Sequence, residues 1–314
     1  MKKPLVIIAG PTAVGKTDLS VALAKRINGS IISADSMQVY KYMDIGSAKI
    51  MPEEMQGIKH YLIDELMPED EFHIVRFQEM AKTALNEIYS EGKIPIIAGG
   101  TGFYIQSLLY NISFEDEETD DSFRNEMEAF ALEYGNEALH QKLKEIDPVS
   151  YETIHFNNVK RVIRALEFYH NNHFPISEHN EEQKKKESPY NFAFFVLNDK
   201  REHLYARIEK RVDVMVEKGL VDEVKKLKEM GYHRDMVSMQ GLGYKEILDY
   251  FDGKTTLDEA IEIIKRETRH FAKRQLTWFR RESDVIWISK DEFSYNEKDI
   301  LGYVIQELEN KKII

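Results

Sequence analysis

A phosphate-binding loop is the first chemical feature of this sequence. Positions 10–17 read GPTAVGKT and match the spacing G-x-x-x-x-G-K-T. In such a loop, backbone N–H groups and the N-terminus of the following helix point at an anion. Lys16 can neutralise the charge of that anion, and the Thr17 hydroxyl can ligate Mg²⁺. The loop predicts a bound di- or triphosphate and leaves ATP, GTP and other diphosphates open.

Two more polar residues follow predicted strands. Asp35 comes after the apolar run 30–34, and Thr101 follows the run 94–98 and its glycines. Ligands of parallel α/β sheets bind at the carboxyl ends of the strands, so we expect both residues to converge on the loop. Asp35 is either a capping or Mg²⁺-side aspartate, or a general base that takes a proton from an acceptor nucleophile.

Basic residues are concentrated in the second half of the chain. Arg207 and Arg211 are four residues apart and share a helical face, which favours either surface ion pairs or a clamp on a phosphate. The segment 265–281 combines a basic stripe with an apolar stripe, typical of a helix that contacts a phosphate backbone, although a solubilising surface has the same pattern. The segment 160–164 is a smaller basic cluster, and 240–245 is a glycine-containing turn that is either an ordinary connection or a binding segment.

Hydrophobic periodicity places these residues on a fold. Strands and helices alternate through residues 1–112, which predicts an α/β class with a P-loop NTPase-like parallel sheet core. Residues 113–188 are helical in pattern and form a predicted insertion domain. The core resumes over 189–314, with a strand at 192–197, helices at 201–230 and 257–281, a strand at 285–288 and a closing helix at 297–311.

Composition excludes several classes of protein. The 314 residues contain no cysteine, which excludes disulfides, thiol catalysis and cysteine-based zinc sites. No apolar run approaches the length of a membrane span, so we expect no membrane contact and a cytoplasmic location. The histidines are scattered, so any metal should be Mg²⁺. A net charge of −12 argues mildly against global nucleic-acid binding, but phosphate contacts depend on local patches.

Several motifs together resemble one family. They are GPTAVGKT at 10–17, ADSMQVYKYMDIGSAK at 34–49, GGTGFY at 99–104 and TRHFAKRQLTWFRRE at 268–282, with HYLID, NNVKRVIRALE and RIEKRV between them. In this order they are similar to the tRNA dimethylallyltransferases, over nearly the whole chain. Eukaryotic members carry a C-terminal zinc finger, so the lack of cysteine makes the bacterial type the expected one.

The resemblance implies an activity. The family transfers a dimethylallyl group from dimethylallyl diphosphate to N6 of the adenosine on the 3′ side of the anticodon, and diphosphate leaves. The implied partners are the tRNA anticodon loop and dimethylallyl diphosphate, the implied cofactor is Mg²⁺ with Thr17 as a ligand, and we expect a monomer. The target base must be extruded from the loop to react.

Matching positions imply site residues. The implied catalytic residues are Lys16, Asp35, Thr101 and Arg211. The implied diphosphate-binding residues are Gly10, Thr12, Ala13, Val14, Gly15, Lys16, Thr17 and Arg211. The implied tRNA-binding residues are Asp35, Ser36, Met37, Gln38, Thr101, Arg124, Lys160, Arg161, Arg164, Gln240, Gly243, Tyr244, Lys245, Lys273, Arg274 and Arg280.

Two other functions fit part of the sequence. A P-loop kinase of a small metabolite would use Lys16, Thr17 and Asp35, but it gives the basic helix and the insertion no role. A nucleotide-switched RNA-binding protein would use the basic helix for RNA and the P-loop as a switch. Prenyl transfer, phosphate transfer and RNA binding without turnover are the outcomes that separate the three.

Overall fold

The chain folds into two compact units. The computed structural model describes residues 2–114, 121–184 and 186–314. The larger unit comprises Met1–Asn111 and Pro189–Ile314, and the smaller unit is Ile112–Ser188. These bounds lie within one residue of the predicted division of the chain, and each unit has a hydrophobic core of its own.

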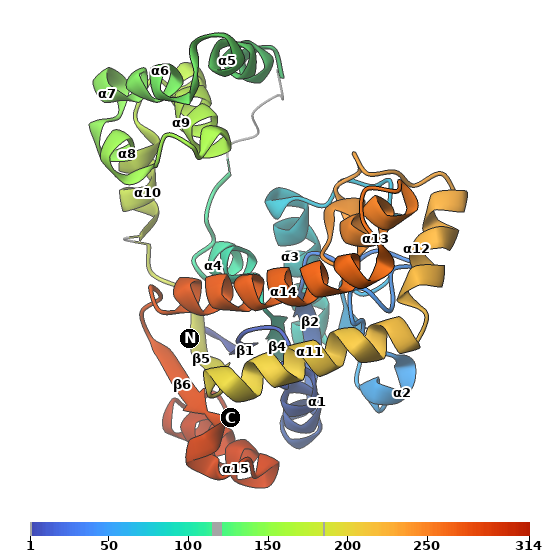
Figure 1. Cartoon of the computed structure of the whole chain (residues 1–314). Coiled ribbons are helices and arrows are strands. Elements are labelled where there is room, and N and C mark those ends of the chain that lie inside the picture. The colour runs from blue at the N-terminus through green and yellow to red at the C-terminus, as the bar shows by residue number, and fades with distance from the viewer. Residues whose placement is uncertain (1, 115–120, 185) are drawn as a thin grey trace. The chain divides into compact units, whose positions relative to one another are not determined.

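A six-stranded parallel sheet is the centre of the larger unit (Figure 1). The strands are β1 (Lys3–Ala9), β2 (Gly29–Ala34), β3 (His60–Tyr61), β4 (Ile94–Gly99), β5 (Tyr190–Asn198) and β6 (Val285–Ser289). Their order across the sheet is β3-β2-β4-β1-β5-β6, and every neighbouring pair is parallel. This confirms the predicted α/β class with a parallel sheet core. It also brings the carboxyl ends of β1, β2 and β4 to one edge.

Both faces of the sheet are buried, as parallel sheets require. In β1, Leu5 and Ile7 belong to one hydrophobic cluster while Val6 and Ile8 belong to the other, because successive side chains point to opposite faces. One face carries α1 (Lys16–Ile27) and α15 (Glu297–Asn310). The other carries α3 (Ile74–Ser90), α4 (Gly102–Leu109) and α14 (Leu257–Phe279).

Three short elements were missed by the sequence patterns. They are α2 (Pro52–Met55), β3, which has two residues, and α13 (Tyr244–Phe251), which begins inside the segment read as a turn. The predicted helix over 201–230 is in fact two helices, α11 (Arg201–Glu217) and α12 (Leu220–Glu229). The break falls at Gly219, whose φ of 100° is in the left-handed region that glycine favours. A short 3₁₀ turn, η1 (Ser238–Gln240), precedes α13, and another, η2 (Lys290–Phe293), follows β6.

The smaller unit is helical in its described residues. Its helices are α5 (Asp121–Tyr134), α6 (Asn136–Gln141), α7 (Leu143–Ile146), α8 (Pro148–Thr153), α9 (Val159–Asn172) and α10 (Ile176–Lys184). Buried side chains of α5, α6, α7 and α9, such as Met127, Leu139 and Leu143, form its core around Val162 and Leu166. Asp147 accepts hydrogen bonds from Ser150 and Ser177, which ties α8 to α10.

Candidate active site

One cavity of about 980 Å³ lies at the carboxyl ends of β1, β2 and β4. Its lining includes Lys16 after β1, Asp35 after β2 and Gly100 after β4, together with Arg211 from α11. The expected convergence of the loop and Asp35 is therefore what the fold produces. The reason is topological, because parallel strands all end at the same edge.

The phosphate-binding loop has the backbone that its glycines allow. Gly10 and Gly15 have φ values of 144° and 100°, where a side chain is strained. A Cβ on Gly10 would lie 2.6 Å from the carbonyl oxygen of Leu197. Gly15 is the N-cap of α1, so the N–H groups of that helix's first turn face the cavity. The Val14 side chain is buried in the core, which leaves its backbone to act on an anion.

Lys16 folds back over the loop. Its Nζ donates hydrogen bonds to the carbonyl oxygens of Gly10 at 3.0 Å and Pro11 at 2.8 Å. Burial, followed by the nearby charge of Arg211, lowers the pKa of Lys16 to about 7, and the charge of Asp35 partly offsets this. A lysine held in this way gains charge when an anion enters the loop, because an opposite charge favours the protonated form.

A second cation faces the same loop. Nη1 of Arg211 donates a hydrogen bond to the Thr12 hydroxyl at 3.4 Å. Burial lowers the pKa of Arg211 and the charge of Asp35 raises it, but a guanidinium keeps its charge at neutral pH. Arg207, one turn earlier on α11, places Nη2 3.4 Å from where a Cβ of Gly15 would be. The loop, Lys16 and the two arginines thus make a strongly cationic cradle.

Asp35 is oriented by the turn that follows it. Its Oδ1 accepts hydrogen bonds from the backbone N–H groups of Met37 at 2.8 Å and Gln38 at 3.4 Å. Its Oδ2 has no hydrogen-bond partner among the described residues, so one carboxylate oxygen is left to accept a proton. Gln38 also lines the cavity, whereas the predicted contacts Ser36 and Met37 do not.

Thr101 lies beside the cavity and is not part of its lining. Its backbone N–H donates to the carbonyl oxygen of Ala34 at 3.2 Å, which fixes the end of β4 to the residue before Asp35. Thr101 is the N-cap of α4, and its hydroxyl makes no capping bond. The role of this hydroxyl in the reaction stays a prediction.

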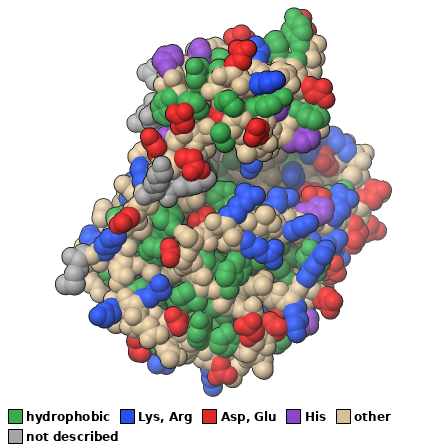
Figure 2. Space-filling view, turned by 90° about the vertical axis from the view of Figure 1, so that its left-hand side faces the viewer, with side chains coloured by type: hydrophobic (Ala, Val, Ile, Leu, Met, Phe, Trp, Pro, Cys, Tyr) green, Lys and Arg blue, Asp and Glu red, His purple; other side chains and the backbone are tan. Residues whose placement is uncertain are grey.

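The basic stripe of α14 divides into two halves. Lys265 pairs with Asp213 at 2.8 Å, and Arg269 pairs with Glu209 at 2.7 Å. Among the described residues, Lys273 and Arg280 have no ion-pair partner, and both are exposed. Arg274 is also exposed and lies over the Phe271 ring. On the face drawn in Figure 2, Lys and Arg side chains gather in a group.

The segment 240–245 gives its residues different surroundings. Gln240 is exposed, and Lys245 lies 3.7 Å from the Glu246 carboxylate. Gly243 is the N-cap of α13, with a φ of 96°. Tyr244 is fully buried in the core, so its ring does not face solvent as a stacking contact with RNA would require. The burial of this ring therefore argues against the predicted tRNA contact of Tyr244.

Two of the four predicted tRNA contacts of the smaller unit share a carboxylate. Arg124 and Arg164 each have a guanidinium nitrogen 3.0 Å from Oε2 of the buried Glu167. Lys160 and Arg161 lie at the start of α9 and are exposed. The shared carboxylate fixes the direction of the two arginines, and their contact with tRNA remains a prediction.

Four residues around the cavity escaped the sequence patterns. They are Lys49, Glu223, Gln275 and Lys290, each of which bonds the backbone of a cavity loop or holds it in place. A local signal exists for two of them. Glu223 falls at helical spacing from the buried Leu220 and Leu227, and Gln275 falls among the buried positions of α14. A polar residue in an apolar stripe needs a partner inside the fold.

Comparisons with known proteins agree over nearly the whole chain. A family model described as IPP transferase matches residues 38–282. The chain is 57% identical over 312 residues to the tRNA dimethylallyltransferase of Lachnoclostridium phytofermentans, covering 99% of each. It is 58% identical over 296 residues to that of Acetivibrio thermocellus, covering 94% of this chain and 95% of the relative.

Solved structures agree with these relatives. The full-length tRNA isopentenylpyrophosphate transferase of Bacillus halodurans is 46% identical, with a TM-score of 0.73 and coverage of 99% of this chain and 98% of that chain. A eukaryotic dimethylallyltransferase, solved in the course of acting on tRNA, is 32% identical with a TM-score of 0.79, covering 91% of this chain and 74% of that one.

Proposed function

The chain belongs to the IPP transferase family, and from that premise we propose that it transfers a dimethylallyl group from dimethylallyl diphosphate to a tRNA. The acceptor is N6 of the adenosine on the 3′ side of the anticodon. The enzyme class rests on the whole-chain match to curated tRNA dimethylallyltransferases. The observation that supports the chemistry is a single cavity that joins a cationic cradle to the carboxylate of Asp35.

The cradle is suited to the leaving diphosphate. Backbone N–H groups at the start of α1, together with Lys16 and Arg211, stabilise the negative charge that grows as the allylic C–O bond breaks. Entry of the diphosphate releases Lys16 from the Gly10 and Pro11 carbonyls that hold it in the free enzyme. The P-loop therefore serves a prenyl donor in the way that it serves a nucleotide elsewhere.

The carboxylate is suited to the acceptor. The N6 amine forms a bond to the allylic carbon while the C–O bond to diphosphate breaks, and the amine gives up one proton. Asp35 accepts that proton at Oδ2, because Oδ1 is occupied by the N–H groups of Met37 and Gln38. The target adenine reaches the cavity only when it is extruded from the anticodon loop.

Mg²⁺ is the proposed cofactor, and the donor set fits it. Among the described residues, no group of three or more His, Cys, Asp or Glu could hold a metal. The exposed Thr17 lines the cavity, and a hydroxyl together with phosphate oxygens and water is a typical Mg²⁺ environment. A bound Mg²⁺ would neutralise charge on the diphosphate.

None of the described helices combines the length and apolar character needed to cross a membrane. A tRNA substrate supports a cytoplasmic location. We also propose that the chain acts as a monomer.

Prenyl transfer is the direct test. The purified chain is incubated with radiolabelled dimethylallyl diphosphate, Mg²⁺ and unmodified tRNA that has adenosines beside its anticodon. Label should enter the RNA, and it should not enter a matched tRNA in which guanosine replaces the target adenosine. Phosphate transfer from ATP to a metabolite would instead identify a kinase, and nucleotide-dependent RNA binding without turnover would identify a switch.

A further inference from the structure

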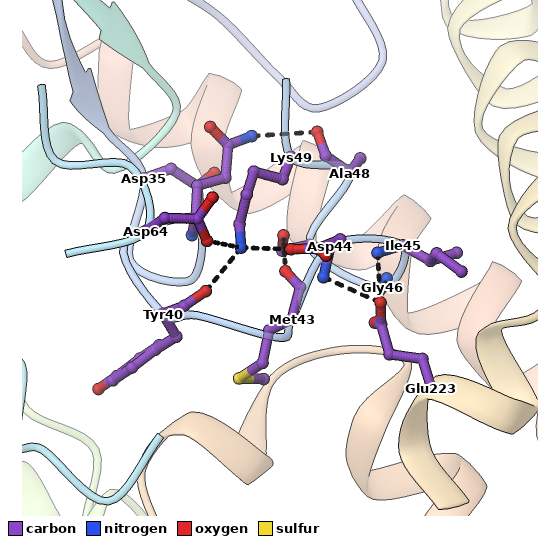
Figure 3. Close-up of polar contacts among 12 residues, drawn as sticks. Asp35, Tyr40, Met43, Asp44, Ile45, Gly46, Ala48, Lys49, Asp64 and Glu223 are labelled. Carbon is purple, nitrogen blue, oxygen red and sulfur yellow. Dashed lines mark hydrogen bonds and ion pairs between the residues drawn. The ribbon is translucent and has the colours of Figure 1, made fainter. Parts of the chain in front are cut away.

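A carboxylate from α12 holds three consecutive residues of the loop between β2 and α2. Glu223 accepts hydrogen bonds from the backbone N–H groups of Asp44 at 2.9 Å, Ile45 at 2.7 Å and Gly46 at 3.0 Å (Figure 3). Hydrogen bonds to a charged acceptor are among the stronger ones in proteins. One side chain thereby fixes the course of this loop from a position about 180 residues further along the chain.

A tyrosine from α13 completes the contact. The Tyr244 hydroxyl donates to Glu223 at 2.8 Å and accepts from the Ser47 backbone N–H at 3.1 Å. Burial and the charge of Glu223 raise the pKa of Tyr244, so the hydroxyl remains a donor. Gly46 packs so closely on the ring that an added Cβ would lie 2.5 Å from it. We refer to Glu223 and Tyr244 as the clamp.

The loop held by the clamp is also fixed from its opposite end. The buried Lys49 donates hydrogen bonds to the Tyr40 carbonyl oxygen at 2.7 Å and to the carboxylates of Asp44 and Asp64 (Figure 3). Both ends of the 44–49 stretch are therefore pinned, and the carbonyl of Ala48 lies between them. This carbonyl has a fixed direction because neither end of its segment is free to move.

That carbonyl orients a side chain of the cavity. Nε2 of Gln38 donates to the Ala48 carbonyl oxygen at 3.2 Å, and Oε1 of Gln38 accepts from the Ser33 hydroxyl at 3.3 Å. These two bonds decide which end of the amide is nitrogen and which is oxygen. One N–H and one oxygen lone pair of Gln38 remain for a ligand. A glutamine amide in a fixed orientation complements the donor and acceptor edge of adenine.

We propose that Glu223 is a positioning residue for recognition of the acceptor base. It holds the 44–48 loop, the loop's Ala48 carbonyl fixes the Gln38 amide, and that amide reads the adenine edge. Tyr244 takes part in this positioning through its hydroxyl, which contacts both Glu223 and the loop. This inference rests on the proposed function, because it concerns how the adenosine-binding side of that site is held in position. Glu223 has no part in the diphosphate cradle.

The test is a double-mutant cycle between the clamp and Gln38. Glu223→Gln offers a single acceptor oxygen, so at least one loop N–H loses its partner, and kcat/KM for the tRNA should fall by about tenfold or more. In a Gln38→Met background the same substitution should lower kcat/KM for the tRNA by less than about threefold, because the amide that Glu223 positions is already absent. Affinity for inorganic diphosphate should stay within about twofold in every variant.

Two further variants provide an alternative to Glu223→Gln and a matched control. Tyr244→Phe retains the ring against Gly46 and removes only the hydroxyl, so it should show the same dependence on Gln38 even if Glu223→Gln folds poorly. Glu259→Gln is the matched control, because that carboxylate accepts the Thr256 N–H at the start of α14 and does not touch the loop. It should leave kcat/KM unchanged.

Opposite results would overturn the inference. Equal losses from Glu223→Gln in the wild-type and Gln38→Met backgrounds would show that the clamp does not act through Gln38. A parallel loss of diphosphate affinity would show general loosening of the site. If the wild-type chain modifies no tRNA, the proposed function itself fails, whereas an additive cycle in an active enzyme removes only the positioning role.

Discussion

Gln275 joins the phosphate-binding loop to the end of β4. Its Oε1 accepts a hydrogen bond from the backbone N–H of Thr12 at 2.9 Å, although 263 positions separate the two residues. Its Nε2 donates to the carbonyl oxygen of Gly100 at 3.0 Å. An added Cβ on Gly100 would lie 2.1 Å from that nitrogen, so a side chain at this position would displace the Gln275 amide. The helix that carries the basic stripe thus holds the phosphate-binding loop in place.

Loss of this bridge should weaken diphosphate binding. Gln275→Met keeps the volume and leaves the Thr12 N–H and the Gly100 carbonyl without their partner, at a cost of about 1–3 kcal/mol in unfolding free energy. Titration calorimetry with inorganic diphosphate should show an affinity about tenfold lower. Gln78→Met is the control, because that buried amide donates to the Ser107 carbonyl away from the cavity. It should lower thermal stability and leave the affinity intact, and equal affinity losses in both variants would contradict this role.

Local patterns explain which parts of the fold could be predicted. The sheet strands are apolar runs, and helices such as α3 and α15 carry long periodic stripes, so both types of element were visible. The two-residue strand β3 is too short to show a period, and α13 follows an N-cap glycine, Gly243, which also suits a turn. The break between α11 and α12 was hidden because the apolar pattern continues on both sides of Gly219.

Some residues of the candidate site could likewise be predicted from local sequence signals, and others could not. The loop at 10–17 and Asp35 are local signals, because a motif and the end of a strand mark them. Glu223 and Gln275 act on backbone groups far away in the chain, and no local pattern names such a partner. The burial of Tyr244 was likewise invisible, since an aromatic residue beside two glycines reads equally well as an exposed contact.

The lowered pKa of Lys16 predicts a pH dependence of diphosphate binding. In the free protein this pKa is about 7, whereas the bound state requires the charged amine. Binding is therefore coupled to proton uptake: affinity is full below pH 7 and falls by about tenfold per pH unit above it. Calorimetry of inorganic diphosphate binding between pH 6 and pH 9 measures the slope.

Lys16→Arg separates this effect from the ionisation of diphosphate itself. A guanidinium stays charged over this range, so the ratio of wild-type to variant affinity should fall as the pH rises. Both proteins meet the same diphosphate species at each pH, so the ligand's own titration cancels in the ratio. A ratio independent of pH would mean that Lys16 is fully charged in the free protein.

The role of Asp35 as a base predicts a loss of turnover without a matching loss of binding. In Asp35→Asn the remaining oxygen can still accept from Met37 and Gln38, so the turn is kept while proton acceptance is lost. The rate of prenyl transfer should fall by about 10²–10⁴-fold. Affinity for tRNA, measured by filter binding, should change by less than about threefold. Near-wild-type turnover of this variant would exclude the assignment.

The division of the basic stripe on α14 predicts which positions contact RNA. Lys273 and Arg280 are exposed and have no ion-pair partner among the described residues, whereas Lys265 is committed to Asp213. Alanine at either of the first two should weaken tRNA binding and lower the slope of log affinity against log salt by about 0.7–0.9 for each phosphate that the side chain neutralises. Binding measured from 50 to about 300 mM salt gives the slopes.

Lys265→Ala removes the same charge from the same helix and is the matched control. Its ammonium already neutralises the Asp213 carboxylate, so few condensed counterions of the RNA depend on it, and the slope should stay that of the wild-type protein. A slope reduced equally by Lys265→Ala and Lys273→Ala would show that the RNA responds to the total charge of α14. Reduction by Lys273→Ala and Arg280→Ala alone would locate the contact at the helix's carboxyl-terminal end, which is also where Gln275 touches the phosphate-binding loop.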